Sequence, residues 1–205
     1  MKRRRLWAGI FSAAAVAAGV ITWSVQSHSV TTPESEPGSV NRTQEANTLF
    51  QAALLQEKYQ DFQGAARTYQ RVLELEPNNK LAWYNLGVLA QRDGRTVEAR
   101  GAYDKALKID PKYASALYNE AVLLKASDTD QAVRLLKRAI AASPRAATAH
   151  LQLGWILTQK KHDDEAEDEF RSAVAADPSL FSQVPEQFQD DVTPTPTSSQ
   201  EGANG

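Results

Sequence analysis

The chain has 205 residues, of which 42% are hydrophobic and 23% are charged, and it contains no cysteine. The lack of cysteine excludes disulfides, thiolate-bound zinc, iron–sulfur clusters and cysteine nucleophiles. Four of the 23 basic residues lie at positions 2–5, so the rest of the chain carries 19 basic and 25 acidic residues. Because nucleic-acid affinity comes largely from Lys and Arg on phosphates, we expect no nucleic-acid partner.

The segment 6–25 contains no charged residue and follows the basic residues 1–5. Twenty helical residues span about 30 Å, which is the thickness of the hydrocarbon core of a bilayer. Trp7 and Trp23 stand near its two ends, where aromatic rings prefer the headgroup layer. The segment is therefore predicted to be a single-pass transmembrane helix, with residues 1–5 in the cytoplasm and the rest of the chain on the extracytoplasmic side of the cell membrane.

A cleaved signal peptide is the main alternative, because small residues at positions 15–17 resemble a cleavage site. The chain would then be secreted after cleavage. Arg3 and Arg4 also faintly resemble a twin-arginine export signal, and a mitochondrial presequence would be similarly rich in Arg.

Two segments lack any hydrophobic period. Residues 26–45 contain Pro33, Pro37 and Gly38 and are predicted to form a flexible linker. Residues 190–205 are rich in Thr, Pro and Ser and are predicted to form a disordered tail.

The segment between them is an internal repeat. Two independent markers recur with the same separations of 34, 33 and 34 residues, namely Pro77, Pro111, Pro144 and Pro178, and Ala65, Ala99, Ala132 and Ala166. A period near 34 residues predicts a helix–turn–helix solenoid. The residue missing from the third unit lies between Ala121 and Ala132, which is where the turn inside that unit is expected.

The second unit, 80–113, carries a spread-out signature made of Trp83, Leu86, Gly87, Gly94, Ala99, Tyr103, Ala106 and Pro111. On these residues the chain resembles the tetratricopeptide repeat (TPR) family. The resemblance implies an all-α solenoid with units at 46–79, 80–113, 114–146 and 147–180. A short helix at 181–189, with Leu180 just before it, is predicted to cap the last unit.

Two residues depart from the family pattern at places where it favours apolar side chains. They are Glu120 in the third unit and His150 in the fourth. Since an unpaired buried charge is costly, one hypothesis is a partly buried pair between them, and the other is that both side chains turn to solvent.

No catalytic motif is present, and we expect no enzyme activity, no cofactor and no metal site. The acidic residues between Asp163 and Glu169 are interpreted as a solvated first helical turn, because they lack calcium-ligand spacing.

In the TPR family the first helices of successive units line a concave groove, so the resemblance implies a protein or peptide partner there. The peptide-binding residues that it implies are Phe50, Gln51, Tyr84, Asn85, Val88, Tyr118, Asn119, Val122, Gln152 and Trp155. Tyr84, Tyr118 and Trp155 are expected to anchor an extended segment, and Asn85 and Asn119 to bond its backbone.

The sequence thus predicts a membrane-anchored, protein-binding adaptor that helps to assemble an envelope or membrane complex. A structural protein that self-associates, and a non-catalytic regulatory subunit of a membrane enzyme, are the alternatives. The sequence does not identify the partner.

Overall fold

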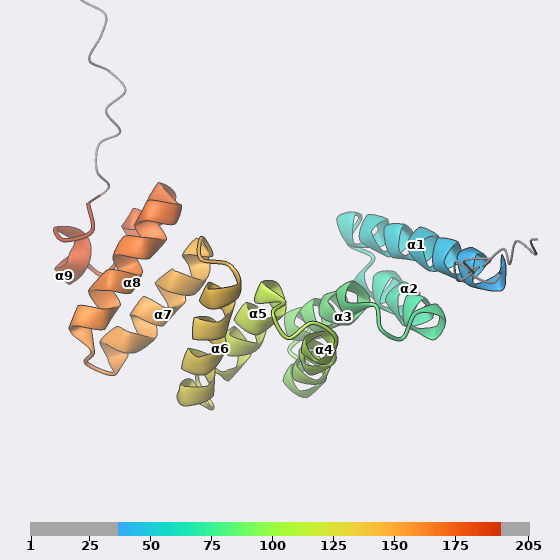
Figure 1. The fold of residues 1–205 in the computed structure, drawn as a ribbon, viewed down its shortest axis with the longest axis horizontal. Helices are drawn as coiled ribbons and strands as arrows, with labels where there is room; N and C mark the ends of the chain where they lie inside the picture. The colour runs from blue at the N-terminus through green and yellow to red at the C-terminus, as the bar shows by residue number, and fades with distance from the viewer. Residues whose placement is uncertain (1–36, 194–205) are drawn as a thin grey trace, which may run out of the picture. The chain divides into compact units, whose positions relative to one another are not determined.

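The computed structural model describes residues 37–193, with side chains from residue 41 onward. This part of the chain is helical throughout and contains no strand (Figure 1). Its α-helices are α1 (Pro37–Lys58), α2 (Phe62–Leu75), α3 (Lys80–Arg92), α4 (Thr96–Ile109), α5 (Ala114–Leu124), α6 (Thr129–Ala142), α7 (Ala147–Gln159), α8 (Asp163–Ala176) and α9 (Glu186–Gln189), with a 3₁₀-helix η1 (Pro178–Gln183) before the last.

The first eight helices pack as consecutive pairs: α1 on α2, α3 on α4, α5 on α6 and α7 on α8. The second helix of each pair also contacts the first helix of the next pair, so the core continues from pair to pair (Figure 1). This is the helical solenoid that the repeat predicts.

Within each pair, a small residue on the first helix faces a large one on the second. Gly87 lies so close to the Tyr103 ring that a Cβ atom built on it would stand 2.5 Å from a ring carbon, and Gly154 lies similarly against Phe170. Tyr103 and Phe170 are completely buried. The small side chain therefore determines how closely the two helices approach.

The second helices end for a common reason. Each is followed by a residue in a non-helical conformation and then by one of the repeated prolines, as at Glu76, Asp110, Ser143 and Asp177. A residue that precedes proline is sterically disfavoured in the α conformation, so the helix ends before it.

The turns inside three of the pairs each contain one residue with positive φ: Gln60, Gly94 and Lys161. The turn of the third pair, residues 125–128, has no such residue among those described. Helix α5 there is two residues shorter than α3 and α7, and its turn is one residue longer. The missing residue of the repeat is thus absorbed where the first helix ends.

The linker predicted over 26–45 is wrong for its last part, because α1 is helical from Pro37. Pro37 is the first helical residue, where a missing N–H and a fixed φ are tolerated. Residues 41–45 are exposed, whereas Ala46 is completely buried. The packed part of α1 supplies the helical nucleus, and extending an existing helix toward its N-terminus is favourable even without further burial.

The predicted cap is present but is built differently from the expected single helix. Pro185 separates η1 from α9, and Leu180, Val184 and Phe188 are buried against the last helix pair. The predicted disordered tail also begins too early, because Val192 is only 2% exposed and belongs to the same core. A single valine in a segment rich in Thr, Pro and Ser forms no hydrophobic pattern, so the sequence does not predict that Val192 is buried.

Within residues 37–193 no helix is both long and apolar enough to cross a membrane. The predicted transmembrane segment 6–25, the basic residues 1–5, and residues 26–36 and 194–205 lie outside the described part of the chain.

Candidate functional site

A depression of about 330 Å³ lies on the surface formed by the first helices of three successive pairs. Its polar and aromatic lining comes from Tyr84 on α3, from Ser115, Tyr118 and Asn119 on α5, and from Thr148 on α7. Ala114, Ser143, Ala146 and Ala149 complete it. We call this set of residues the Tyr118 depression.

The sequence of α5 explains why these side chains share one face. Ser115, Tyr118 and Asn119 are three and four residues apart, which places them side by side on a helix. The opposite face carries Leu117 and Ala121, which are buried in the core. Burial of that apolar face turns the polar face outward.

Asn119 is already hydrogen-bonded to the wall of the depression. Its Nδ2 donates to the Tyr84 hydroxyl oxygen at 3.1 Å. The equivalent Asn85 donates to the Tyr69 hydroxyl at 3.0 Å, and that hydroxyl donates to Glu57 Oε1 at 2.6 Å. The two asparagines therefore connect neighbouring pairs of helices, a role that the sequence alone does not predict. One amide N–H of each asparagine is thus used in packing between successive pairs.

Tyr84 forms a fixed wall of the depression. Its ring packs edge-on against Tyr113 at 5.1 Å between centroids and also lies 6.0 Å from Tyr103. Burial raises the pKa of Tyr84 above the usual value of tyrosine, although bonds from Asn119 and Ser115 oppose this. The hydroxyl is therefore neutral at physiological pH, and no residue that lines the depression is charged.

Three of the ten predicted groove residues line the Tyr118 depression, namely Tyr84, Tyr118 and Asn119. Phe50 packs on Tyr69 with ring centroids 5.5 Å apart, and Trp155 packs edge-on on Phe170 at 6.1 Å. Gln152 accepts a hydrogen bond from Lys125 Nζ at 3.4 Å. Gln51 is exposed, and Asn85, Val88 and Val122 are partly buried on α3 and α5.

Ser115 and Thr148 line the depression but are not among the binding residues that the sequence predicts. They stand at equivalent places in successive repeats, 33 residues apart, and Ser115 lies one helical turn before Tyr118. Extending the predicted row by one turn toward the helix N-termini would have found both.

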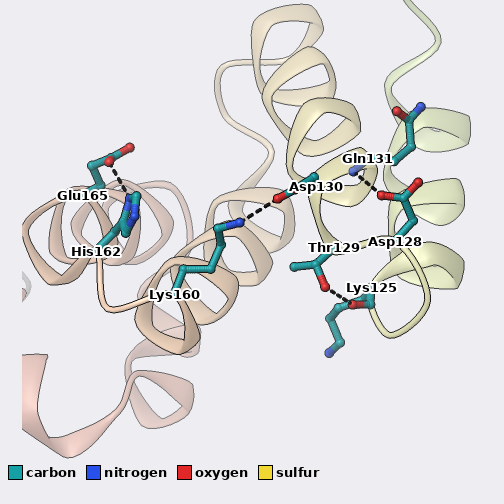
Figure 2. Close-up of polar contacts among 8 residues, drawn as sticks. All are labelled: Lys125, Asp128, Thr129, Asp130, Gln131, Lys160, His162 and Glu165. Atoms are coloured by element: carbon teal, nitrogen blue, oxygen red, sulfur yellow. Dashed lines mark hydrogen bonds and ion pairs between the residues drawn. The ribbon is translucent and has the colours of Figure 1, made fainter.

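The turns of the third and fourth pairs carry a separate group of polar contacts, shown in Figure 2. Lys160 Nζ, after α7, lies 2.6 Å from Asp130 Oδ1 on α6 and holds the pKa of that carboxyl below its usual range. Asp128 accepts from the Gln131 backbone N–H at 2.9 Å and so caps α6. His162 Nδ1 lies 3.0 Å from Glu165 Oε1. In the part of the chain with described side chains, no group of three His, Asp or Glu residues is arranged to hold a metal ion.

The predicted pair between Glu120 and His150 does not form, and neither side chain turns to solvent. Glu120 is 3% exposed and faces α4, where Arg100 Nε lies 3.8 Å from its Oε1. Burial raises the pKa of Glu120, and the negative charge of Asp104 raises it further. The sequence predicts that the two residues face each other between the third and fourth units. In the structure Glu120 instead lies near Arg100 on α4, and His150 contacts Glu169 on α8.

His150 instead contacts Glu169 and the chain that leads into α7. Its Nδ1 lies 2.6 Å from Glu169 Oε2, and its Nε2 lies 3.1 Å from the Pro144 carbonyl oxygen. A carboxylate and a carbonyl can only accept, so this geometry favours the doubly protonated ring. The bond to Glu169 accordingly raises the pKa of His150, against the opposing effect of burial.

A family model described as "Tetratricopeptide repeat" matches residues 50–114 and 122–180, which is more than half of the chain. The chain belongs to the TPR family. The two matched stretches contain α3 and α7, whereas Ser115, Tyr118 and Asn119 on α5 lie in the short gap between them. The boundaries of four units at 46–79, 80–113, 114–146 and 147–180 stay predictions.

Solved structures with the same fold include that of MamA, which is 26% identical with a TM-score of 0.57 over 63% of this chain and 77% of that one. YrrB, described as a TPR protein with an unusual peptide-binding site, is 23% identical with a TM-score of 0.60 and covers 71% of this chain and 75% of that one. At that identity the likeness to YrrB concerns the fold alone.

Among curated proteins, the human protein O-mannosyl-transferase TMTC3 is 30% identical over 115 residues, 54% of this chain and 13% of the transferase. Anaphase-promoting complex subunit 3 of Schizosaccharomyces pombe is 32% identical over 106 residues, 51% of this chain and 16% of the subunit. The peroxisomal targeting signal receptor of Saccharomyces cerevisiae is 36% identical over 62 residues, 30% of this chain and 10% of the receptor. The chain thus spans less than a fifth of the length of each.

Proposed function

We propose that the chain is a membrane-anchored TPR adaptor that holds an extended segment of a partner protein in the Tyr118 depression. The observation that carries the proposal is the convergence there of two tyrosines, an asparagine, Ser115 and Thr148 from three successive helix pairs. Hydroxyl and amide groups can pair with the N–H and C=O groups of an extended backbone, and the partly buried tyrosine rings offer contact area at low entropic cost.

The lining also indicates what kind of segment fits. Since the depression carries no charged residue, recognition would depend on neutral hydrogen bonds and aromatic contact. Binding should therefore weaken only modestly with rising salt. The peptide-binding site described for YrrB, which shares the fold, is consistent with this use of a TPR surface.

The proposal includes membrane attachment through residues 6–25, with the repeats on the extracytoplasmic side, and assembly of an envelope or membrane complex. It rests on the uncharged segment and its basic flank. Carbonate extraction of membranes and N-terminal sequencing of the mature chain test it. A mature N-terminus near Ala18 or Gly19 would instead show a cleaved signal peptide and a secreted adaptor.

We further propose that the chain is an adaptor and not an enzyme. Related proteins include a transferase, but this chain matches only 13% of it. In the described region the Tyr118 depression offers hydroxyl and amide groups but no ionisable acid–base pair. A non-catalytic regulatory subunit would use the same surface, and identification of the partner separates the two roles.

The test begins with capture of the partner. A photo-reactive phenylalanine analogue at Tyr118 keeps an aromatic ring in the depression and cross-links what lies against it in living cells. A peptide from the cross-linked segment is then titrated, by fluorescence anisotropy, against the unmodified chain, Ser115→Arg and Ser172→Arg.

Ser115 and Ser172 are both exposed helical serines, but only Ser115 lines the depression, so the same bulky substitution at Ser172 is a matched control. We expect Ser115→Arg to bind roughly tenfold more weakly, which corresponds to about 1.4 kcal/mol. Equal affinity of the two variants would show that the partner binds elsewhere.

A further inference from the structure

A second depression, of about 340 Å³, lies between the helices α2, α3 and α4. Its floor is apolar and is made of Trp83, Leu86, Leu89 and Ala90 on α3, together with Ala66 on α2 and Ala102 on α4. We call it the Trp83 depression. It shares no lining residue with the Tyr118 depression. Trp83 and Tyr84 are consecutive residues of α3, so their side chains point about 100° apart and the two depressions open in different directions.

Gly101 at the rim leaves this depression open. It lies inside α4, and a Cβ atom built on it would meet nothing within 4 Å, so packing does not require glycine there. The other three helix pairs carry a charged side chain at the equivalent place, namely Arg67, Arg134 and Asp168. A glycine inside a helix is destabilising relative to alanine. The second pair therefore has a helix-weakening residue whose one structural effect is to keep the depression clear.

The aromatic wall of the depression is held in place. The Trp83 Nε1–H donates to the Pro77 carbonyl oxygen at 2.8 Å, which fixes the indole ring. Lys105 Nζ lies 3.9 Å from the centroid of that ring, in a cation–π contact. The depression thus places an apolar surface and a cation next to each other.

The rim carries an excess of positive charge, with Arg95 and Lys105 against Glu98. Arg95 pairs with Glu98 and also with Asp93, at 3.0 Å from the Asp93 Oδ2. Within the part of the chain whose side chains are described, Lys105 forms no ion pair. A ligand that complements this rim therefore brings a carboxylate to Lys105.

The open rim favours a protein as the source of that ligand. Gln70, Arg95, Glu98, Gly101 and Lys105 are all exposed, so the depression covers an occupant from one side only. Sites for small molecules bury about 70–90% of the ligand surface. A side chain that projects from another protein is instead covered on its outer side by its own chain, and the Gln70 amide at the rim can pair with the backbone of that chain.

We propose that the Trp83 depression binds a partner protein through an aliphatic side chain that stands next to a carboxylate. The aliphatic side chain lies on the apolar floor, and the carboxylate pairs with Lys105 Nζ. Because the two depressions share no residue, this site does not depend on the Tyr118 depression, and the chain binds two partner segments at once.

Disulfide tethering tests this proposal in the full-length chain in detergent. Because the chain has no cysteine, Gly101→Cys introduces a single thiol at the rim of the depression. The variant is equilibrated with β-mercaptoethanol and a blocked peptide of the sequence cysteine–glycine–leucine–glutamate. Intact-mass spectrometry then gives the fraction of chains that carry the peptide. Two further peptides replace the glutamate with glutamine or the leucine with serine.

We expect capture of the leucine–glutamate peptide to withstand about five- to tenfold more β-mercaptoethanol than capture of the serine peptide, because the floor buries an apolar side chain. The advantage over the glutamine peptide should be about two- to fivefold, because exposed ion pairs are weak. Arg134→Cys, at the equivalent exposed place on α6, is the matched control and should show no preference for leucine. Lys105→Gln should remove the preference for glutamate, whereas Lys108→Gln, which removes another exposed charge from α4, should keep it.

Equal capture of the three peptides at Gly101→Cys would overturn the proposal. So would an equal leucine preference at Arg134→Cys, or a glutamate preference that survives Lys105→Gln. Mercaptohexanoate, an aliphatic carboxylate without a peptide backbone, tests the other source of the same chemistry. If it were captured as well as the leucine–glutamate peptide, the depression would be a site for a small carboxylate and the protein partner would be wrong.

Discussion

Replacing Gly87 with alanine should destabilise the protein, although alanine is the better helix former. Gly87 lies inside α3, and a Cβ atom there would stand 2.5, 2.6 and 3.1 Å from three carbons of the Tyr103 ring. The ring has little room to move, because it is completely buried and its hydroxyl donates to Gln91 Oε1 at 2.7 Å.

The expected magnitude is the difference between two opposing effects. Gly→Ala in a helix interior contributes about 1 kcal/mol of stability, and overpacking a close-packed core costs about 1–3 kcal/mol. The net change should be a loss of up to about 2 kcal/mol. Gly101→Ala on α4 is the matched control, since nothing lies within 4 Å of a Cβ atom there, and it should stabilise by about 0.5–1 kcal/mol.

The third helix pair supplies a rescue, because it combines Ala121 with Leu136 at the equivalent places, and both are buried. Tyr103→Leu should therefore cost less in the Gly87→Ala background than alone, with a coupling free energy of about 1 kcal/mol. Urea unfolding followed by circular dichroism, in one detergent-containing buffer throughout, measures all four variants. If Gly87→Ala stabilised as much as Gly101→Ala, or if the two substitutions were strictly additive, the close approach would not be what limits residue 87.

Three further predictions concern the turns, the cap and the buried ionisable groups. Lys161→Gly should stabilise the protein by about 0.5–1 kcal/mol, because positive φ costs a non-glycine residue about 1 kcal/mol. Gly94→Ala should destabilise it by a similar amount for the same reason. A lower melting temperature for Lys161→Gly than for Gly94→Ala would contradict this prediction. Val192→Ala should cost about 1–2 kcal/mol, whereas Val97→Ala, 87% exposed, should change stability by less than about 0.5 kcal/mol; equal urea midpoints would show that Val192 is not part of the core. Stability should fall as pH rises above 6.5, and His150→Leu should remove that dependence, as measured by melting temperature from pH 5.5 to 8.5.

The repeat made the helical architecture predictable, because its prolines and its alanines recur with the same separations. Together they predict where the turns lie and where the second helices end. It also located the missing residue of the third pair, although not the shortening of α5 that absorbs it. Departures from the repeat were harder to predict. The burial of Val192 depends on contacts with the last helix pair, and the helical part of 37–45 depends on the packed part of α1 that it extends, and a local composition encodes neither.

The candidate site was only partly predictable for a similar reason. Helical spacing placed Tyr118 and Asn119 on one face, as observed. It could not show that Asn85 and Asn119 donate to tyrosines of neighbouring helices, because those bonds depend on how successive pairs are rotated. Hence one residue type serves both packing and the proposed recognition, and Asn119→Ala would disturb the two together. Ser115, at the rim, is the cleaner position for testing binding.

The two buried ionisable groups should make stability depend on pH in the same direction, but in different ranges. The pKa of Glu120 is raised above 4.5, chiefly by burial, so its contribution to stability is complete below 4.5 and is lost as pH rises through the folded-state pKa. The pKa of His150 is raised above 6.5 by Glu169, so its contribution is present below 6.5 and is lost as pH rises through the folded-state value.

Other parts of the chain provide suitable replacements for both residues. Leu117 stands at the place of His150 one repeat earlier, and Leu86 and Leu153 stand at the place of Glu120. Glu120→Leu should therefore remove the pH dependence that begins above 4.5, and His150→Leu the part that begins above 6.5. Asp110 and Asp130 have pKa values lowered by Lys80 and Lys160, so their contributions are lost only as pH falls below 3.8 and do not overlap with either range. A melting temperature that rose between pH 6.5 and 8.5 would contradict the assignment of a protonated His150 between Glu169 and Pro144.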